Sequence, residues 1–283
     1  MVQEAIKKAD VLVEALPYIK KFQKKIFVIK YGGSILGEER VRKSVLEDVA
    51  FLRYAGIQPM IVHGGGPNIT ERLKKEKVLT KFIDGMRVTD EFTLKVVEEE
   101  LNELNDLIVG EINSHGVRAQ GFKSKNSILK AIKKQGEVDL GLVGEVVDFD
   151  RHKLTHALRE HIPVVCPMGV SSQGVVFNIN ADEVAFFLAS QLKAEKLVLL
   201  TNVLGVMRNP RDEHSLISTI TAQGVEDLIR ENIIEEGMIP KVRAAAKAIE
   251  SGVGKAHIVD AKIPHALLLE IFTDKGISTE IVK

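Results

Sequence analysis

Two glycine-rich loops near the start of the chain carry residue types suited to binding anions. Residues 30–34 read Lys-Tyr-Gly-Gly-Ser and residues 63–67 read His-Gly-Gly-Gly-Pro, and each loop ends a short apolar run. Glycine lets backbone N–H groups turn toward an anion, and a helix that begins just afterwards adds its positive N-terminal end. Two such loops, one of them with Lys30, predict two anionic groups held close together. Phosphoryl transfer is therefore the first reaction to consider.

Three further segments place polar side chains at predicted helix starts. Residues 178–182 hold Asn178, Asn180 and Asp182, although an N-cap needs only one such residue, so we favour a functional role for the segment. Lys241 falls in the first turn of another predicted helix, where a cation opposes the helix dipole. It suits a bound anion, with a solvated surface lysine as the alternative.

Arg87 stands just before a predicted helix whose N-cap is Thr89 or Asp90. The planar guanidinium matches the geometry of a carboxylate, which predicts a carboxylate substrate. A surface ion pair is the alternative when this segment is taken alone.

The elements that must position these residues alternate between strands and helices. We predict strands at 26–31, 59–62, 164–168, 196–201 and 257–259, and a last edge strand at 278–282. Predicted helices span 2–22, 41–54, 68–75, 90–114, 181–192, 240–251 and 264–273. Residues 118–151 break the rhythm and predict a hairpin, from 129–132 and 142–147, that projects from the main sheet. This order is typical of parallel βαβ units in an α/β fold.

Composition excludes several classes of partner and site. The 283 residues carry 39 Lys+Arg and 39 Asp+Glu, which gives no reason to expect a nucleic acid or a membrane as partner. No apolar run approaches a membrane span, and we predict a cytoplasmic protein. The single cysteine, Cys166, lies in an apolar run and is interpreted as a core residue in a reducing compartment. A Walker-type loop and a G-x-G-x-x-G motif are both missing from the sequence.

The ordered set of segments resembles the amino-acid kinase family and, within it, the acetylglutamate kinases, from about residue 15 to the last strand. The resemblance implies an open αβα sandwich with a mainly parallel central sheet. It implies transfer of the γ-phosphoryl group of ATP, with Mg²⁺, to the side-chain carboxylate of N-acetyl-L-glutamate, a step of arginine biosynthesis. It also divides the chain into an N-terminal oligomerisation helix (1–24), an acyl-substrate lobe (25–172) and a nucleotide lobe with an effector region (173–283).

The resemblance assigns roles to matching positions. Lys30 and Lys241 would neutralise the transferring phosphoryl group, and Asp182 would hold both lysines in position. No protein ligand for a metal is predicted. The substrate-binding residues would be Gly65, Gly66, Arg87 and Asn178. The nucleotide-binding residues would be Gly32, Gly33, Ser34, Thr201, Asn202, Val203, Gly205 and Met238.

The N-terminal helix resembles the extra helix of arginine-inhibited members, which form a hexamer as a trimer of dimers. The same homo-oligomer, with L-arginine as inhibitor, is therefore expected here. The predicted effector contacts are Tyr18, Lys196, His257 and Glu270.

Several positions depart from the family pattern. Asn202 replaces a usual aspartate, Glu236 replaces a glycine, and residues 102–105 keep only the final asparagine of a G-K-x-N element. Ala261 and Ser278 stand where glycines are usual near the effector region. Two alternatives stay open: a catalytically weak or inactive arginine-sensing domain of the same fold, and a sibling kinase for carbamate or another acidic amino acid.

Overall fold

The computed structural model describes residues 2–83, 85–234, 237–273 and 276–283. Two positions singled out from the sequence fall outside this description. They are Glu236 and the side chain of Ser34.

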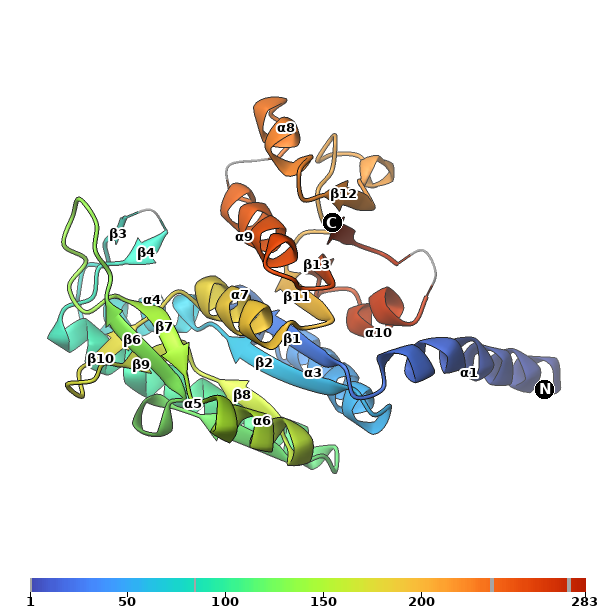
Figure 1. The fold of residues 1–283 in the computed structure, drawn as a ribbon, viewed down its shortest axis with the longest axis horizontal. Coiled ribbons are helices and arrows are strands. Elements are labelled where there is room, and N and C mark those ends of the chain that lie inside the picture. Colours follow the sequence, from blue (N-terminus) through green and yellow to red (C-terminus); the bar gives the residue numbers. More distant parts are fainter. Residues whose placement is uncertain (1, 84, 235–236, 274–275) are drawn as a thin grey trace.

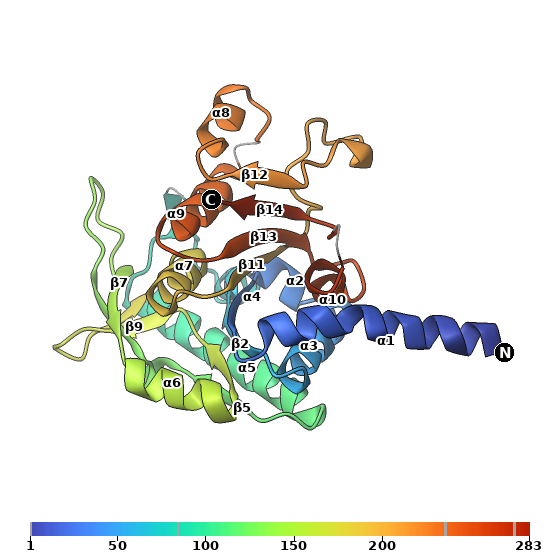
Figure 2. The ribbon, with the colours of Figure 1, turned by 45° about the vertical axis from the view of Figure 1, so that its right-hand side comes forward.

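An eight-stranded sheet forms the centre of the molecule, in the order β12-β14-β13-β11-β1-β2-β8-β5 (Figures 1 and 2). Neighbouring strands run parallel except for the antiparallel pair of β13 and β14. The predicted mainly parallel α/β fold is confirmed. The strands are β1 (Ile26–Tyr31), β2 (Gln58–His63), β5 (Ala119–Phe122), β8 (Ile162–Val165), β11 (Lys196–Thr201), β12 (Thr219–Thr221), β13 (Lys255–Asp260) and β14 (Thr279–Val282).

Helices cover both faces of this sheet, because alternate side chains of each strand point to opposite faces. Phe27, Ile29 and Tyr31 of β1 pack in one core with apolar residues of α3, α5 and α10, whereas Val28 packs in a second core with α6, α7 and α9. The helices are α3 (Glu39–Tyr54), α5 (Glu91–Ser114), α6 (Arg151–Glu160), α7 (Ala181–Leu192), α9 (Ile239–Glu250) and α10 (Ala266–Ile271).

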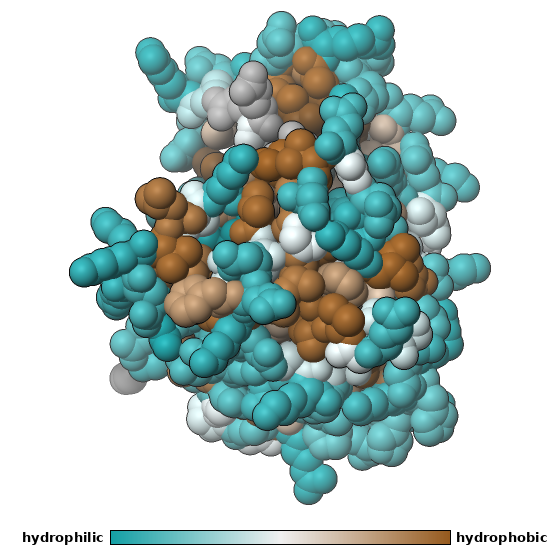
Figure 3. Space-filling view, turned by 90° about the vertical axis from the view of Figure 1, so that its left-hand side faces the viewer, coloured by the Kyte–Doolittle hydropathy of each residue, from teal (hydrophilic) through white to brown (hydrophobic). Residues whose placement is uncertain are grey.

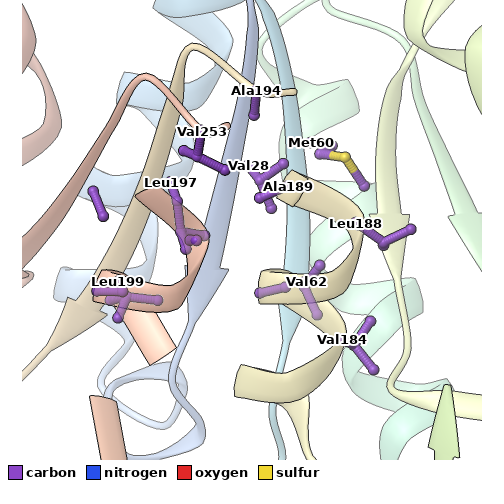
Figure 4. Packing of buried hydrophobic residues seen from close by; sticks show 14 of the residues in the cluster. Val28, Met60, Val62, Val184, Leu188, Ala189, Ala194, Leu197, Leu199 and Val253 are labelled. Carbon is purple, nitrogen blue, oxygen red and sulfur yellow. The ribbon is translucent and has the colours of Figure 1, made fainter. Parts of the chain in front are cut away.

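The contact of α7 with the middle of the sheet sets the position of the helix start. Figure 4 shows Ala189 of α7 beside Val28 of β1, and the side chains of Val184 and Leu188 are 0% exposed, as are those of Val28 and Val62. Burying a side chain of this size contributes roughly 1.5–3 kcal/mol. The N-terminus of α7 is therefore held firmly over the carboxyl ends of β1 and β2.

A second sheet and a small hairpin project from one end of the molecule (Figure 1). The second sheet has the order β10-β9-β6-β7, and the predicted hairpin at 118–151 corresponds to its antiparallel pair β6 and β7. Two details of the prediction were wrong: residues 119–122 join the main sheet as β5, and the strand at 164–168 ends at Val165. The strands are β3 (Phe82–Ile83), β4 (Met86–Arg87), β6 (Leu129–Lys133), β7 (Gly144–Phe149), β9 (Met168–Val170) and β10 (Val176–Asn178).

The two ends of the chain also differ in part from expectation. The predicted first helix is confirmed as α1 (Val2–Phe22), and it extends away from the body of the molecule (Figures 1 and 2). The predicted edge position of the last strand was wrong, since β14 lies between β12 and β13. The remaining short helices are α2 (Gly33–Leu36), α4 (Gly66–Lys75) and α8 (Val225–Arg230), with 3-10 turns at Ser124–Asn126 and Glu213–Ser215. Among the described residues, no helix combines the length and apolarity needed to cross a membrane.

Candidate active site

The two glycine loops lie against each other. They leave the carboxyl ends of β1 and β2, which pair in parallel with Tyr31 opposite His63. A Cβ placed on Gly33 would stand 3.0 Å from the backbone nitrogen of Gly65 and 2.9 Å from that of Gly66. Only glycine at Gly33 permits this approach, and it brings the starts of α2 and α4 to one point. Two helix N-termini that converge in this way favour a shared anion.

Lys30 and Asp182 form an ion pair beside these loops. Lys30 Nζ lies 2.9 Å from Asp182 Oδ1, and the lysine is only 9% exposed. Lys30 comes from β1 and Asp182 from the first turn of α7, so the packing of α7 on the sheet fixes their separation. The pair holds a cation at the mouth of the glycine loops without giving it complete burial.

Arg87, the last residue of β4, is a buried cation with a free donor. Its Nη2 donates to the carbonyl of Gly66 (3.1 Å) and to Thr70 Oγ1 (2.8 Å), and its guanidinium lies 4.7 Å from the ring centroid of Phe82. Its Nη1 is buried and has no hydrogen-bond partner among the described residues. Burial lowers the pKa of Arg87, which nevertheless stays charged. An unpaired buried guanidinium nitrogen is suited to a ligand carboxylate.

Asn178 and Asn180 have different structural roles. Asn180 is the N-cap of α7, and its Oδ1 accepts from the backbone nitrogens of Asp182 (2.8 Å) and Glu183 (3.3 Å). Asn178 instead donates from Nδ2 to Thr89 Oγ1 at 3.2 Å. One residue thus suffices as the cap, and the other is available to the site.

Several of these groups line one cleft of about 240 Å³, whereas Asp182 lines a neighbouring one. Six of the predicted residues share this lining: Lys30, Gly33, Gly65, Gly66, Arg87 and Asn178. Apolar side chains that were not predicted complete it: Ile69, Phe82, Leu101, Val143 and Ile179. The end of the molecule that carries β3, β4, β6 and β7 has several apolar patches set among hydrophilic side chains (Figure 3). The cleft therefore combines cationic and amide donors with an apolar wall, a lining suited to an acidic ligand that also has an apolar part.

Three of the eight predicted nucleotide residues lie at a second, more apolar pocket of about 200 Å³. Val203, Gly205 and Met238 line it, together with Ile233 and Ile234. Gly205 has φ +148°, and a Cβ there would meet Thr279 Oγ1 at 2.5 Å, so this turn requires glycine.

Other predicted nucleotide residues have different positions. Thr201 Oγ1 accepts from the backbone nitrogen of Val203 at 3.2 Å and so shapes the loop that leaves β11. Asn202 is exposed and does not line this pocket. A Cβ placed on Gly32 would stand 3.2 Å from the carbonyl oxygen of Leu200.

Lys241 lies in the first turn of α9, as predicted. It makes no ion pair with any residue that the structure describes, and in particular none with Asp182. The neighbouring Pro240 and Asp182 line a common cleft of about 550 Å³ between α7 and α9. The lysine is therefore available to an incoming anion, whereas Lys30 is already paired.

All four predicted effector residues line one cavity of about 720 Å³ on the other side of the sheet from α7. Lys196 Nζ donates to His257 Nε2 (2.8 Å), and His257 Nδ1 donates to Glu270 Oε1 (2.6 Å). Lys196 also lies 5.3 Å from the ring centroid of Phe22, at the end of α1 that carries Tyr18. The N-terminal helix and the C-terminal elements thus meet at this cavity.

Burial controls the protonation of this chain of three residues. It lowers the pKa of Lys196 to about 8 and lowers the pKa of His257. Burial also opposes ionisation of Glu270, but hydrogen bonds from His257 and from the backbone of Ile277 hold its pKa below the ordinary value. The floor of the cavity is a buried lysine, a neutral histidine and a carboxylate, each with a partner.

Sequence reasoning missed the residues that support Arg87. Thr70 and Phe82 touch its guanidinium, and Thr89 bonds both the carbonyl of Arg87 and the amide of Asn178. Thr70 lies one helical turn after the second glycine loop, and this spacing is the one sequence feature that could have indicated its contact with Arg87. Within the described residues, no group of three or more His, Cys, Asp or Glu side chains could hold a metal ion.

The model of the amino acid kinase family matches residues 25–260. The acetylglutamate kinase of Desulforamulus reducens is 45% identical over 281 residues, covering 98% of this chain and 98% of the relative. The acetylglutamate kinase of Petrotoga mobilis is 44% identical, covering 99% of this chain and 95% of the relative.

Solved structures agree with this relationship. An N-acetylglutamate synthase of Neisseria gonorrhoeae in complex with coenzyme A and N-acetyl-glutamate matches 97% of this chain with a TM-score of 0.88 and 26% identity. This chain spans only 63% of that synthase. The same synthase has been solved with coenzyme A and L-arginine. A Giardia carbamate kinase shares the fold, with a TM-score of 0.67 at 15% identity. The chain belongs to the amino acid kinase family, alongside the acetylglutamate kinases.

Proposed function

We propose that this protein transfers the γ-phosphoryl group of ATP to the side-chain carboxylate of N-acetyl-L-glutamate, giving N-acetyl-L-glutamyl 5-phosphate for arginine biosynthesis. Relatives named acetylglutamate kinase, at about 45% identity over nearly their whole length, support this reaction. The observation that carries it in the structure is the meeting of the two glycine loops beside Lys30.

The chemistry requires two anions to approach each other. A carboxylate oxygen attacks the γ-phosphorus, a new C–O–P linkage forms, and the bond from the γ-phosphorus to the β–γ bridging oxygen breaks as ADP leaves. The nucleophile is already ionised, so no general base is needed. Electrostatic repulsion is the main barrier, and preorganised donors lower it.

The donors that we assign to this task come from two sides. Lys30, held by Asp182, and the amides of Gly65 and Gly66 face the reacting groups from the β1 and β2 side. Lys241, at the start of α9, approaches from the nucleotide side. Asp182 keeps Lys30 in place, and its proposed contact with Lys241 would form only with the nucleotide bound.

Substrate recognition follows from the same cleft. The free Nη1 of Arg87 is assigned to the α-carboxylate of the substrate, and Asn178 to its acetamido group. The apolar wall, with Leu101 and Val143, suits the methylene chain and the acetyl methyl group. An amino acid with a free, charged amino group would desolvate that charge here without compensation.

The nucleotide half, 173–283, would bind ATP, with the adenine in the apolar pocket of Val203, Gly205 and Met238. Ser34, Gly32, Thr201 and Asn202 keep their predicted nucleotide roles as part of this proposal. Mg²⁺ would neutralise the phosphate oxygens of the nucleotide and retain water as its other ligands, the usual arrangement for this ion. The described residues offer no acidic cluster that would compete for it.

Regulation by L-arginine belongs to the same proposal. The cavity of Tyr18, Lys196, His257 and Glu270 holds both carboxylates and ammonium groups, as an amino acid with a cationic side chain requires. The projecting α1 has exposed apolar residues, Val13 and Leu16 among them, which support its role in a homo-oligomer of dimers assembled as a hexamer. The cytoplasmic location predicted from the sequence stays a prediction.

A coupled ADP-release assay tests the proposed function. With ATP, Mg²⁺ and N-acetyl-L-glutamate, we expect turnover that falls when L-arginine is added. Free L-glutamate, N-acetyl-L-aspartate and carbamate serve as matched acceptors, and turnover with one of them alone would favour a sibling kinase. Arginine binding by calorimetry with no ADP release under any of these conditions would favour the arginine-sensing domain.

A further inference from the structure

His63 is fully buried at the end of β2, directly before the second glycine loop. Its Nδ1 lies 3.1 Å from the carbonyl oxygen of Gly64. Its Nε2 lies 3.1 Å from Asn105 Nδ2 and 3.3 Å from Cys166 Sγ. The ring thus joins the glycine loop to α5 and to the loop after β8.

These contacts select one protonation state of the ring. A carbonyl oxygen can only accept, so His63 Nδ1 carries the hydrogen and donates to Gly64. Nε2 is then the acceptor for Asn105, whose second amide hydrogen goes to the carbonyl of Val164 at 2.9 Å. Burial lowers the pKa of His63 to about 4, so the ring is neutral at physiological pH.

The bond to Gly64 also fixes the direction of the next amide. In a trans peptide the C=O and N–H groups point to opposite sides. A Gly64 carbonyl turned toward His63 therefore turns the Gly65 N–H away from the ring and toward the first loop. The Gly65 nitrogen accordingly faces Gly33, at 3.0 Å from the site of its missing Cβ, and it has no hydrogen-bond partner in the described chain.

Both ends of Gly64 are held. Its N–H donates to the carbonyl of Tyr31 at 2.9 Å, and its carbonyl accepts from His63. Without the second bond, a run of three glycines would rotate this peptide at little steric cost. A rotated peptide would direct a carbonyl oxygen into the cleft, where it would repel both the carboxylate and the phosphoryl group.

We propose that His63 is a positioning residue for the phosphoryl transfer. Its Nδ1–H donates to the carbonyl of Gly64 and so keeps the Gly65 amide directed toward the reacting oxygens. Asn105 stabilises the His63 tautomer that makes this bond. The proposal rests on the proposed kinase function. It also gives a role to Asn105 of α5, the one residue of the G-K-x-N element that this chain keeps. Cys166 Sγ also lies 3.3 Å from Nε2, but its thiol is placed to donate to the carbonyl oxygen of Leu101 at 3.3 Å.

A matched pair of variants separates this role from simple packing. In His63→Asn the amide nitrogen takes the place of Nδ1 and can still donate to Gly64. In His63→Gln the amide reaches the position of Nε2 and leaves Gly64 without a donor. We expect His63→Gln to lose kcat by about 10²-fold, comparable to the loss of an oxyanion donor, and His63→Asn to recover most of that loss. The KM for ATP should change little in either.

Cys166→Ala is the control for a cavity at the same ring, and its kcat should stay near that of the unaltered protein. Equal losses of kcat in His63→Asn and His63→Gln, at comparable thermal stability, would overturn the proposal. So would a loss in Cys166→Ala as large as in His63→Gln. The activity of the unaltered protein tests the kinase function, and the comparison of the variants tests the positioning role of His63. Either one can therefore be disproved without the other.

The tautomer gives a readout that needs no variant to fold and no substrate. In ¹⁵N NMR of the full-length protein labelled at histidine, the His63 resonances are assigned by triple-resonance transfer. They should show a protonated Nδ1 and an unprotonated Nε2. A protonated Nε2 would mean that the ring does not donate to Gly64, and it would overturn the proposal.

Discussion

The cleft that contains Arg87 and the cavity that contains Lys196 both hold buried cations, but the hydrogen-bond partners of these cations differ. In the cleft, Arg87 Nη1 and the Gly65 backbone nitrogen have no hydrogen-bond partner among the described residues. In the cavity, Lys196 and His257 are linked to each other and to Glu270 by hydrogen bonds. The cleft can therefore bind an anion without breaking a hydrogen bond. In the cavity, a ligand must replace the existing hydrogen bonds among Lys196, His257 and Glu270.

This difference indicates which of the two sites gains free energy when a ligand binds. An unpaired buried donor costs about 1–3 kcal/mol, and an anionic ligand recovers that cost on binding. A paired network gives no such gain, but residues of α1 and α10 line its cavity, so a ligand that rearranges the network would contact both helices. The cleft is therefore suited to substrate binding and the cavity to regulation.

Removal of Lys30 or Lys241 should have the largest effect on turnover. We expect Lys30→Ala and Lys241→Ala each to lose on the order of 10²–10³ in kcat, because each removes a charge that stabilises the transferring phosphoryl group. Steady-state kinetics with circular dichroism as a check on folding measures this. Lys43→Ala, which removes an exposed lysine of α3 paired with Glu39, is the control. A near-normal rate in either active-site variant would remove the assignment of that lysine.

Arg87→Met should separate affinity from stability. Loss of a charge-assisted bond predicts an increase of roughly 10- to 100-fold in the KM for N-acetyl-L-glutamate. The variant without substrate should melt at a higher temperature, because it no longer buries an unpaired charge. Arg72→Met, which removes an arginine already paired with Glu99 and Glu100, should leave KM unchanged. A lower melting temperature for Arg87→Met would show that the guanidinium is satisfied in the free protein.

Glu270→Gln tests the effector cavity. We expect arginine affinity to fall by about 10-fold, the effect of losing one charge-assisted hydrogen bond, with kcat unchanged when arginine is absent. Isothermal titration and inhibition curves give the two values. Glu226→Gln alters an exposed carboxylate paired with Arg243 and serves as the control. Unaltered inhibition in Glu270→Gln would place the effector elsewhere.

The last prediction concerns pH and the buried lysine, and it affects stability rather than activity. Since burial lowers the pKa of Lys196 to about 8, the folded protein releases this proton at a lower pH than the unfolded chain, whose lysine pKa is about 10.4. The free energy of unfolding should therefore rise from pH 8 to 10 relative to that of Lys196→Met, by at most about 3 kcal/mol. Paired thermal melts across this range measure it. A constant difference would mean that Lys196 keeps its proton in the cavity.

The sequence predicted the parts of the site that depend on strand ends. Lys30 and the two glycine loops follow β1 and β2, and parallel neighbours bring such ends together. The segment 178–182 was informative because it had more polar residues than a cap requires, and Asn180 proved to be the cap. The support for Arg87 by Phe82 was not predictable, since it depends on how a two-residue strand folds back over the cleft.

The same reasoning explains the errors in the fold. Residues 219–221 have one buried apolar side chain, Ile220, between two exposed threonines, so the three-residue β12 had too weak a pattern to be recognised. Without β12, the strand at its side became an edge in the prediction. His63 gave no signal of its role either, because its partners Asn105 and Cys166 lie far away in the chain and only the folded sheet brings them to its ring.

The central claim is that the side-chain carboxylate attacks the γ-phosphorus in the cleft of the two glycine loops. The most direct test uses N-acetyl-L-glutamate with ¹⁸O in the side-chain carboxylate, ATP and Mg²⁺, followed by hydroxylamine to trap the acyl phosphate. We predict a hydroxamate product and inorganic phosphate that carries one ¹⁸O atom, detected by its ³¹P shift. ADP release without hydroxamate, or phosphate without ¹⁸O, would contradict the account.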